Sequence, residues 1–389
     1  MNFFCSPFYV RLAIVLLAAT GALAQAAGRD WQPTSDSQVI ETLPPRVRAA
    51  NTTATQTPQA AALAARQAIN LARQTADVRY LGRAQTSLAP WWGRSDAPVE
   101  LAVLQATVQQ SRHEFAAAKT VLTQALQREP QHAQGWLTLA TLERVAGNYP
   151  AAIAACAQVT RAGAAVHGAA CQLETTSLQG KHDEARRGLT ALQRQTPDAS
   201  TQAWLGSLLA ESEERAGRDS AALAAYQASL ALAPDGYTAL AAADLLLRTD
   251  QAGAALKLLA DQPASDAVLL RRAYAMKQQK IPQWQALASE LQARFAALEQ
   301  RGDDPATHAR ERAQAHLWLG ADAARAWPSA RLNLTLQKEP SDWWLALHSA
   351  QRAGLTSELV RLRAEVAATG LRDARLSSML ADSMQVGKI

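Results

Sequence analysis

The sequence predicts an all-α protein built from repeated antiparallel helix hairpins, and three observations support this fold class. Hydrophobic residues make up 48% of the 389 residues, but only 5% are aromatic, and alanine and leucine dominate over β-branched residues. Such a composition favours helices that pack closely through small side chains. Apolar residues also recur at three- and four-residue steps, as a buried helix face requires. Finally, small residues recur along the chain at a spacing of about 34 positions.

The clearest hairpin covers residues 133–163. Its first helix is predicted from a stripe at three- and four-residue steps, formed by Trp136, Leu139, Ala140 and Glu143. The segment 147–150 (Gly-Asn-Tyr-Pro) interrupts this stripe, because Gly suits the left-handed turn that ends a helix and Pro suits the first turn of the next. A second stripe follows on Ala152, Ile153, Cys156 and Val159. This unit is therefore a helix–turn–helix of about 34 residues.

The same unit recurs in one register along the chain. A small residue near the start of each second helix falls at Ala84, Ala118, Ala152, Ala185, Ala222 and Ala255, with separations of 34, 34, 33, 37 and 33. A proline closes three of the units, at Pro130, Pro197 and Pro234. The order of Trp, Leu, small residue, turn Gly, Tyr and Ala resembles the tetratricopeptide repeat. This resemblance implies a right-handed α-solenoid of antiparallel helix hairpins, in which the first helices line a concave groove that binds a protein segment.

Four regions are expected. Residues 58–263 form the repeat array, and residues 264–389 are helical but lose the register, with 306–370 as degenerate repeats. In this C-terminal region we expect one helix pair at 306–327 and 329–338, divided at Pro328, and a last hairpin that starts at residue 340. Residues 25–57 are rich in Thr, Pro, Gln and Ala and predict a flexible leader.

Residues 1–24 predict a cleaved secretory signal peptide. Arg11 precedes an apolar run from Leu12 to Leu23, and the run ends in a small-residue cleavage pattern, Ala-Leu-Ala. About a dozen residues fall short of the roughly 20 that span a membrane, so no stable membrane span is expected after cleavage. The protein is then periplasmic or secreted. Anchorage by an uncleaved signal is the alternative.

Charge and motifs argue against nucleic acid and against catalysis. Loss of the signal would lower the formal charge from +5 to +4, and no Lys/Arg cluster interleaved with aromatics occurs, so no nucleic-acid partner is expected. The nucleotide loops GxxxxGK[ST] and GxGxxG, the nucleophile motif GxSxG and the metal motifs HExxH and CxxC are also missing. We therefore expect no enzyme activity, no catalytic residue, no cofactor and no metal site.

The resemblance assigns a set of first-helix residues to the partner-binding groove. Half of them are acids and two are aromatics expected to be exposed; the set comprises Gln134, Arg144, Glu174, Trp204, Glu211, Glu214, Tyr237 and Asp244. Acidic walls would favour a basic or neutral peptide or helix of a protein partner. The alternative is that these residues are ordinary solvated helix faces.

Two further features leave alternatives open. Cys156 and Cys171 fall on neighbouring helices and could form a disulfide in an oxidising compartment, or could fill space as free thiols. The tandem tryptophans at 91–92 and 343–344 are either packing residues or, if exposed, a platform for a glycan. The leading functional hypothesis is a non-catalytic periplasmic scaffold or adaptor. The alternative is an accessory factor in the assembly or export of an envelope polymer.

Overall fold

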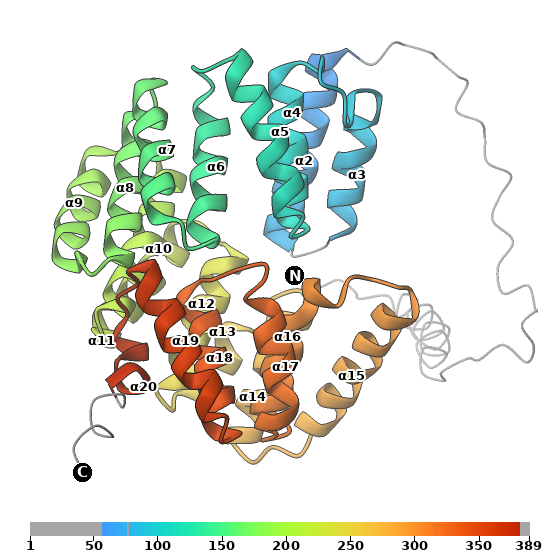
Figure 1. Cartoon of the computed structure of the whole chain (residues 1–389), viewed down its shortest axis with the longest axis vertical. Helices are drawn as coiled ribbons and strands as arrows, with labels where there is room; N and C mark the ends of the chain where they lie inside the picture. Colours follow the sequence, from blue (N-terminus) through green and yellow to red (C-terminus); the bar gives the residue numbers. More distant parts are fainter. Residues whose placement is uncertain (1–56, 76–77, 382–389) are drawn as a thin grey trace, which may run out of the picture. The chain divides into compact units, whose positions relative to one another are not determined.

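The computed structural model describes residues 57–75 and 78–381. The predicted signal peptide and residues 25–56 of the predicted leader lie outside the described residues. Where the chain is described, it forms helices and no strands (Figure 1). None of these helices is both long enough and apolar enough to cross a membrane.

Six antiparallel hairpins make up the first two thirds of this structure, which confirms the predicted α-solenoid. Each pairs an even-numbered helix with the following odd-numbered one. In chain order they are α2 (Pro58–Thr75) with α3 (Arg79–Leu88), α4 (Val99–Ser111) with α5 (Phe115–Arg128), α6 (Ala133–Val145) with α7 (Tyr149–Arg161), α8 (Ala165–Leu178) with α9 (His182–Gln195), α10 (Ala199–Arg215) with α11 (Asp219–Leu232), and α12 (Gly236–Arg248) with α13 (Ala252–Leu258).

The alanines that set the predicted register explain how the hairpins close. All six lie on the second helices, and each has a solvent exposure of 0%. A methyl group is the largest side chain that allows two helices to approach closely at such a point, so a larger residue there would overpack the hairpin. The spacing of these alanines in the sequence therefore marks the positions at which the two helices of each hairpin pack against each other.

Three more hairpins follow after a loop at residues 259–265. They are α14 (Asp266–Gln278) with α15 (Trp284–Gln300), α16 (Ala309–Trp318) with α17 (Ala323–Asn333), and α18 (Pro340–Arg352) with α19 (Thr356–Thr369), with short helical turns η2 (Pro305–His308), η3 (Ala374–Leu376) and α20 (Ser377–Ala381). The first helices α12, α14, α16 and α18 continue to contact one another in sequence. The predicted helical, repeat-like character of this region is thus present.

One predicted helix boundary is wrong. The break between α16 and α17 lies at residues 319–322, and Pro328 lies inside α17 instead of dividing two helices. Asp322 decides the start of α17, because its side chain accepts a hydrogen bond of 3.0 Å from the backbone N–H of Arg325. An internal proline costs about 3 kcal/mol, which the full burial of Ala326 and Ala330 on the same helix helps to offset.

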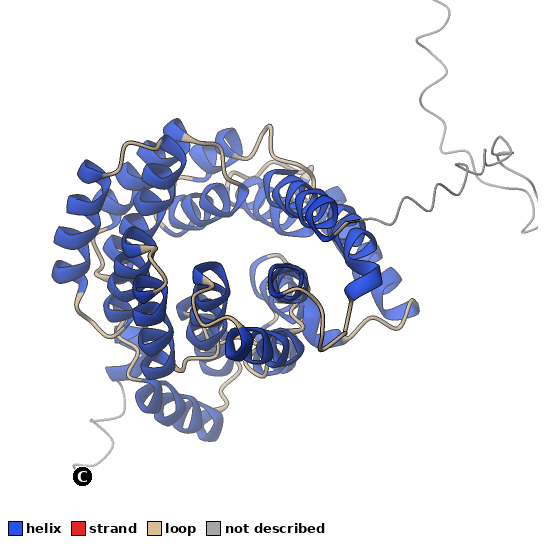
Figure 2. Ribbon diagram, turned by 90° about the horizontal axis from the view of Figure 1, so that it is seen from above, coloured by secondary structure: helices blue, strands red, loops and turns tan. Residues whose placement is uncertain are grey.

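The C-terminal hairpins turn back onto the repeats. Tyr149 and Leu178, which lie at the turn ends of α7 and α8, belong to the same buried cluster as α17, α18 and α19. The backbone N–H of Lys338 donates to the carbonyl of Val145 at 2.7 Å, and that of Arg372 donates to Leu178 at 2.8 Å. Seen from above, a ring of helices encloses further helices (Figure 2). The N-terminal helix α2 contacts α12, ten helices later in the chain.

Candidate partner-binding surface

The first helices α4, α6, α8 and α10 lie side by side and form an inner wall, which α12 extends. All eight residues that the sequence assigned to the groove lie on α6, α8, α10 and α12. They do not share one environment, however. Most are engaged with arginines, and only a few remain open to solvent.

The acids of this set are paired, so the predicted acidic character of the wall is wrong. Arg144 and Glu174 form an ion pair of 2.8 Å between α6 and α8. Asp244 receives two hydrogen bonds, of 2.7 and 2.6 Å, from the guanidinium of Arg271 on α14. Each carboxylate charge is therefore neutralised locally by a guanidinium group, which is an effective partner because its donors match both carboxylate oxygens.

Glu214 is the most heavily engaged acid. It is 5% exposed and accepts hydrogen bonds from Arg248 at 3.2 Å and from Arg375 at 2.9 Å. The hydroxyl of Tyr226 donates to its other carboxylate oxygen at 3.1 Å. Arg375 lies in η3, 161 positions after Glu214 in the sequence. This network therefore joins the inner wall to the C-terminal end of the described structure.

Glu211 is also partly enclosed and lies 3.3 Å from Arg215, one turn further along α10. Burial raises the pKa of Glu211 to about 6, and the positive charge of Arg215 opposes that rise. Glu174 and Glu339 act in the same direction as burial. This carboxyl is therefore close to a protonation change at mildly acidic pH.

The two aromatics differ from each other. Tyr237 is 59% exposed, whereas Tyr149 and Tyr226 are buried at 1% and 0%. The charge of Glu211, followed by partial enclosure, raises the pKa of Tyr237 well above its usual value. Trp204 is half-buried and stacks on His167, with 5.3 Å between ring centroids.

Trp204 also lines a cavity of about 280 Å³. This cavity lies where α2 approaches α10 and α12, and α2 contributes Asn70, Arg73 and Gln74 to its lining. Hydroxyl groups of Ser200 and Ser207 line it beside the indole. An aromatic face next to amides, hydroxyls and one guanidinium can hold a ligand that is partly apolar and partly hydrogen-bonding.

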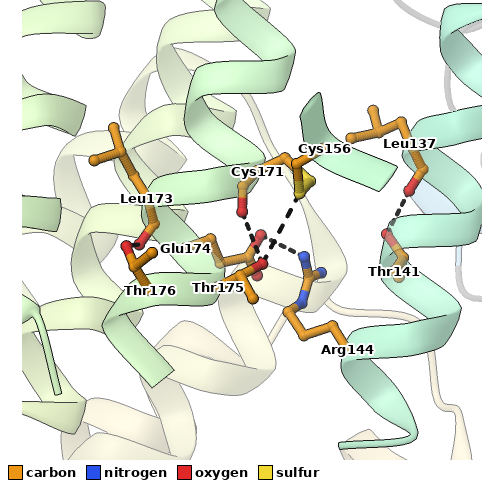
Figure 3. The surroundings of a disulfide bond; sticks show 9 residues. All are labelled: Leu137, Thr141, Arg144, Cys156, Cys171, Leu173, Glu174, Thr175 and Thr176. Atoms are coloured by element: carbon orange, nitrogen blue, oxygen red, sulfur yellow. Dashed lines mark hydrogen bonds and ion pairs between the residues drawn. A yellow bond between two sulfur atoms is a disulfide. The ribbon is translucent and has the colours of Figure 1, made fainter. Parts of the chain in front are cut away.

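The remaining groove residue, Gln134, is exposed near the start of α6, where its side-chain amide donates to Thr138 at 3.3 Å. One of the two cysteines, Cys171, lies further along the same wall. Cys156 on α7 and Cys171 on α8 form a disulfide, with 5.5 Å between their Cα atoms. Figure 3 shows this bond beside the Arg144–Glu174 ion pair. The disulfide therefore joins two consecutive hairpins at the wall.

Sequence reasoning missed the charged residues that face the wall from the C-terminal region. The guanidinium of Arg310 on α16 donates to Asp342 at 2.7 and 2.8 Å and to Glu339 at 2.7 Å. Glu339 and Asp342 also cap the N-terminus of α18 reciprocally. That capping pattern is readable in the sequence, at positions 339–342, but nothing local indicates that it faces α6 and α10.

The tandem tryptophans do not form an exposed platform. Trp343 is 1% exposed, Trp344 stacks on His348 at 4.6 Å, and Trp91 and Trp92 pack against the N-terminal hydrophobic cluster. Among the described residues, no group of three or more His, Cys, Asp or Glu side chains is placed to hold a metal ion.

The comparison with protein families agrees with the repeat register. Residues 111–170, from the end of α4 into α8, match the family model described as tetratricopeptide repeat. This segment matches tetratricopeptide repeats. The matched segment includes the hairpin of α6 and α7, in which the sequence pattern is clearest.

Several solved structures are similar to this chain. A thermophilic tetratricopeptide-repeat protein of Thermus thermophilus is 20% identical, with 49% of this chain and all of that one covered and a TM-score of 0.39. A Rap protein, solved in complex with competence and sporulation factor, is 12% identical over 92% of this chain and 94% of that one, with a TM-score of 0.47. A tetratricopeptide repeat protein of Parabacteroides merdae is 12% identical over 66% of this chain and 99% of that one, with a TM-score of 0.38. No curated protein matches the sequence.

Proposed function

We infer that this chain is a non-catalytic scaffold of the cell envelope that binds a segment of a protein partner on its inner wall around Tyr237. Tetratricopeptide repeats in general support a protein-interaction scaffold. The observation that carries the location is the exposure of Tyr237, 59%, on the first helix α12, whereas Tyr149 and Tyr226 on the second helices α7 and α11 are buried. Exposed tyrosine provides a large contact area and a hydrogen-bonding tip, which is typical of interface residues.

The neighbourhood of Tyr237 limits the chemistry of the partner. Glu211 and Tyr237 influence each other's ionisation, so both face one space. Trp204 adds an aromatic face at the adjoining cavity. A segment that places an apolar side chain on Trp204 and a hydrogen-bond donor at Glu211 would be complementary to this surface.

Export to the envelope rests on two supports. The pattern of residues 1–24 is that of a signal peptide. The disulfide between Cys156 and Cys171 is of the kind that forms and persists outside the reducing cytosol.

A second candidate is a role in the assembly or export of an envelope polymer. The cavity beside Trp204 favours it, because an indole face surrounded by amide and hydroxyl groups suits a sugar ring. The same surface would then hold a glycan in place of a peptide.

Photocrosslinking separates these possibilities. A benzophenone amino acid at position 237 is expected to give one discrete protein adduct in envelope extract, and Trp204→Ala is expected to reduce its yield. The same photoreactive residue at Val360, which is 60% exposed on α19, is the matched control. Adducts with polysaccharide would favour the second candidate, and identical adducts from positions 237 and 360 would exclude the assigned surface.

A further inference from the structure

The stacking of hairpins is interrupted at one junction. In the part of the chain that the structure describes, the backbones of α15 and α16 stay further apart than those at any other junction between a second helix and the next first helix. Side chains still bridge this junction, because Arg312 of α16 reaches Glu299 and Phe295 of α15. The connection here is long enough for the helices to separate, because residues 301–308 form a loop and the 3-10 turn η2. A cavity of about 400 Å³ occupies the space between them.

The floor of this cavity is apolar. Trp284, Leu291 and Phe295 of α15 line one side, and Ala315 and Leu319 line the other. Leu291, Phe295 and Leu319 pack in one cluster, which borders the cavity. The volume is within the range of small-molecule sites, roughly 300–1,000 Å³.

Two arginines stand at the rim of the cavity, each with one carboxylate partner, Glu299 for Arg312 and Asp322 for Arg325. Arg312 and Arg325 line it, and Asp322 is the one carboxylate among the lining residues. Burial, followed by the charge of Arg325, lowers the pKa of His316, so this ring adds no charge at neutral pH. A complementary ligand would therefore be apolar over most of its surface and anionic at one end.

Arg312 has unused hydrogen-bonding capacity. One of its terminal nitrogens pairs with Glu299, and the other donates to the carbonyl of Phe295 at 3.1 Å. Its Nε is buried and has no hydrogen-bond partner. An unpaired buried donor costs about 1–3 kcal/mol.

We propose that the cavity between α15 and α16 binds a small apolar carboxylate. Its hydrocarbon body lies against Trp284 and Phe295, and its carboxylate is held by Arg312 and Arg325. The guanidinium groups suit this role because they bind carboxylates through directed, charge-assisted hydrogen bonds. The site is distinct from the surface around Tyr237, and the proposal does not depend on the function inferred for that surface.

Calorimetric titration of the full chain with decanoate tests the proposal, with decanol as the uncharged control of equal chain length. We expect saturable binding of one decanoate, with a dissociation constant on the order of 100 µM, and much weaker binding of decanol. Ala288→Phe fills the cavity and is expected to abolish binding. Ala293→Phe makes the same change at an exposed position of α15 and is expected to leave binding unchanged.

A second pair of variants tests the charge. Arg325 is 76% exposed and lies 3.4 Å from Asp322, so Arg325→Gln leaves the fold intact and is expected to weaken decanoate binding about three- to fivefold. Arg361→Gln is the control, because Arg361 is 61% exposed and makes a comparable pair with Glu358 at 3.3 Å. Equal affinity for decanol and decanoate, or undiminished binding by the Ala288→Phe variant, would overturn the proposal.

Discussion

Glu211 shows how one residue of the inner wall couples stability to pH. The pKa of its carboxyl is about 6 in the folded chain, against an ordinary value of 4.5, because burial disfavours the charged form. The folded state therefore binds a proton more tightly than the unfolded state does. Below about pH 4.5 this group contributes about 2 kcal/mol to the free energy of unfolding. The contribution is lost as the pH rises through 6.

We therefore expect Glu211→Gln to raise the free energy of unfolding at pH 7 and to change it little at pH 4.5. The amide mimics the protonated carboxyl, so the variant no longer needs to bury a charge. Urea unfolding at both pH values measures the difference. Glu290→Gln is the matched control, because Glu290 also pairs with an arginine four residues later, at 2.7 Å, but on an exposed face. If the free energy of unfolding changes between pH 4.5 and pH 7 by the same amount in the variant as in the wild type, Glu211 does not titrate in this window.

At the scale of elements, the disulfide fixes the junction between α7 and α8. It closes a loop of 15 residues and has buried half-cystines, with exposures of 0% and 1%. Closing a loop of this length stabilises a folded chain by about 3 kcal/mol through the entropy of the unfolded state. We expect Cys156→Ala combined with Cys171→Ala to lose about that amount in urea unfolding.

Reduction of the wild-type protein with dithiothreitol provides the control for this prediction. It should lower the denaturation midpoint towards that of the double variant, and it should not affect the variant itself. A midpoint that responds to neither change would mean that the packing of α7 on α8 suffices without the bond.

The elements also show where sequence patterns stop being sufficient. The hairpins up to α13 were predictable because Ala84 and its five counterparts act within one hairpin, at a fixed spacing. Pro328 misled the prediction of α17, because burial of that helix outweighs the local cost of a proline. The wider backbone separation of α15 and α16 had no local sequence signal, since it depends on how two hairpins pack against each other.

The candidate site was predictable in one of its two aromatics and not in its electrostatics. Tyr237 was expected to be exposed, and it is. Trp204 was also expected to be exposed, but it is half-buried against His167. Glu214 was expected to contribute an acidic surface, but one of its arginine partners, Arg375, comes from 161 positions later in the chain. No periodicity within one repeat carries information about such a contact, because it depends on how the C-terminal hairpins fold back.

At the scale of the described structure, that fold-back is the feature that distinguishes this chain from an open array of repeats. Leu371 and Leu376 of the returning segment are 1% and 0% exposed. The segment passes over the turns between first and second helices, where Arg372 lies against Gly180 and Ala374 against Gly217. Both glycines have positive φ angles, 92° and 75°, that other residues adopt only with strain. The closure therefore uses the same turns that shape the repeats.

Arg375→Ala tests whether this closure is held by the network at Glu214. Glu214 would keep Arg248 and Tyr226 as partners. The buried side chain of Asp373 would lose its ion pair of 2.6 Å with Arg375. We therefore expect a loss of about 1 to 3 kcal/mol. The amide of Arg372, which donates to Leu178, reports on the closure, and its hydrogen exchange should accelerate at least tenfold. The amide of Lys338, bonded to Val145 at a separate contact, should accelerate less.

Arg301→Ala is the control, because Arg301 makes the same kind of bridge to an aspartate two residues away, Asp303, without reaching across the structure. If exchange at Arg372 is the same in both variants, the apolar contacts of Leu371 and Leu376 hold the closure without the ion pair.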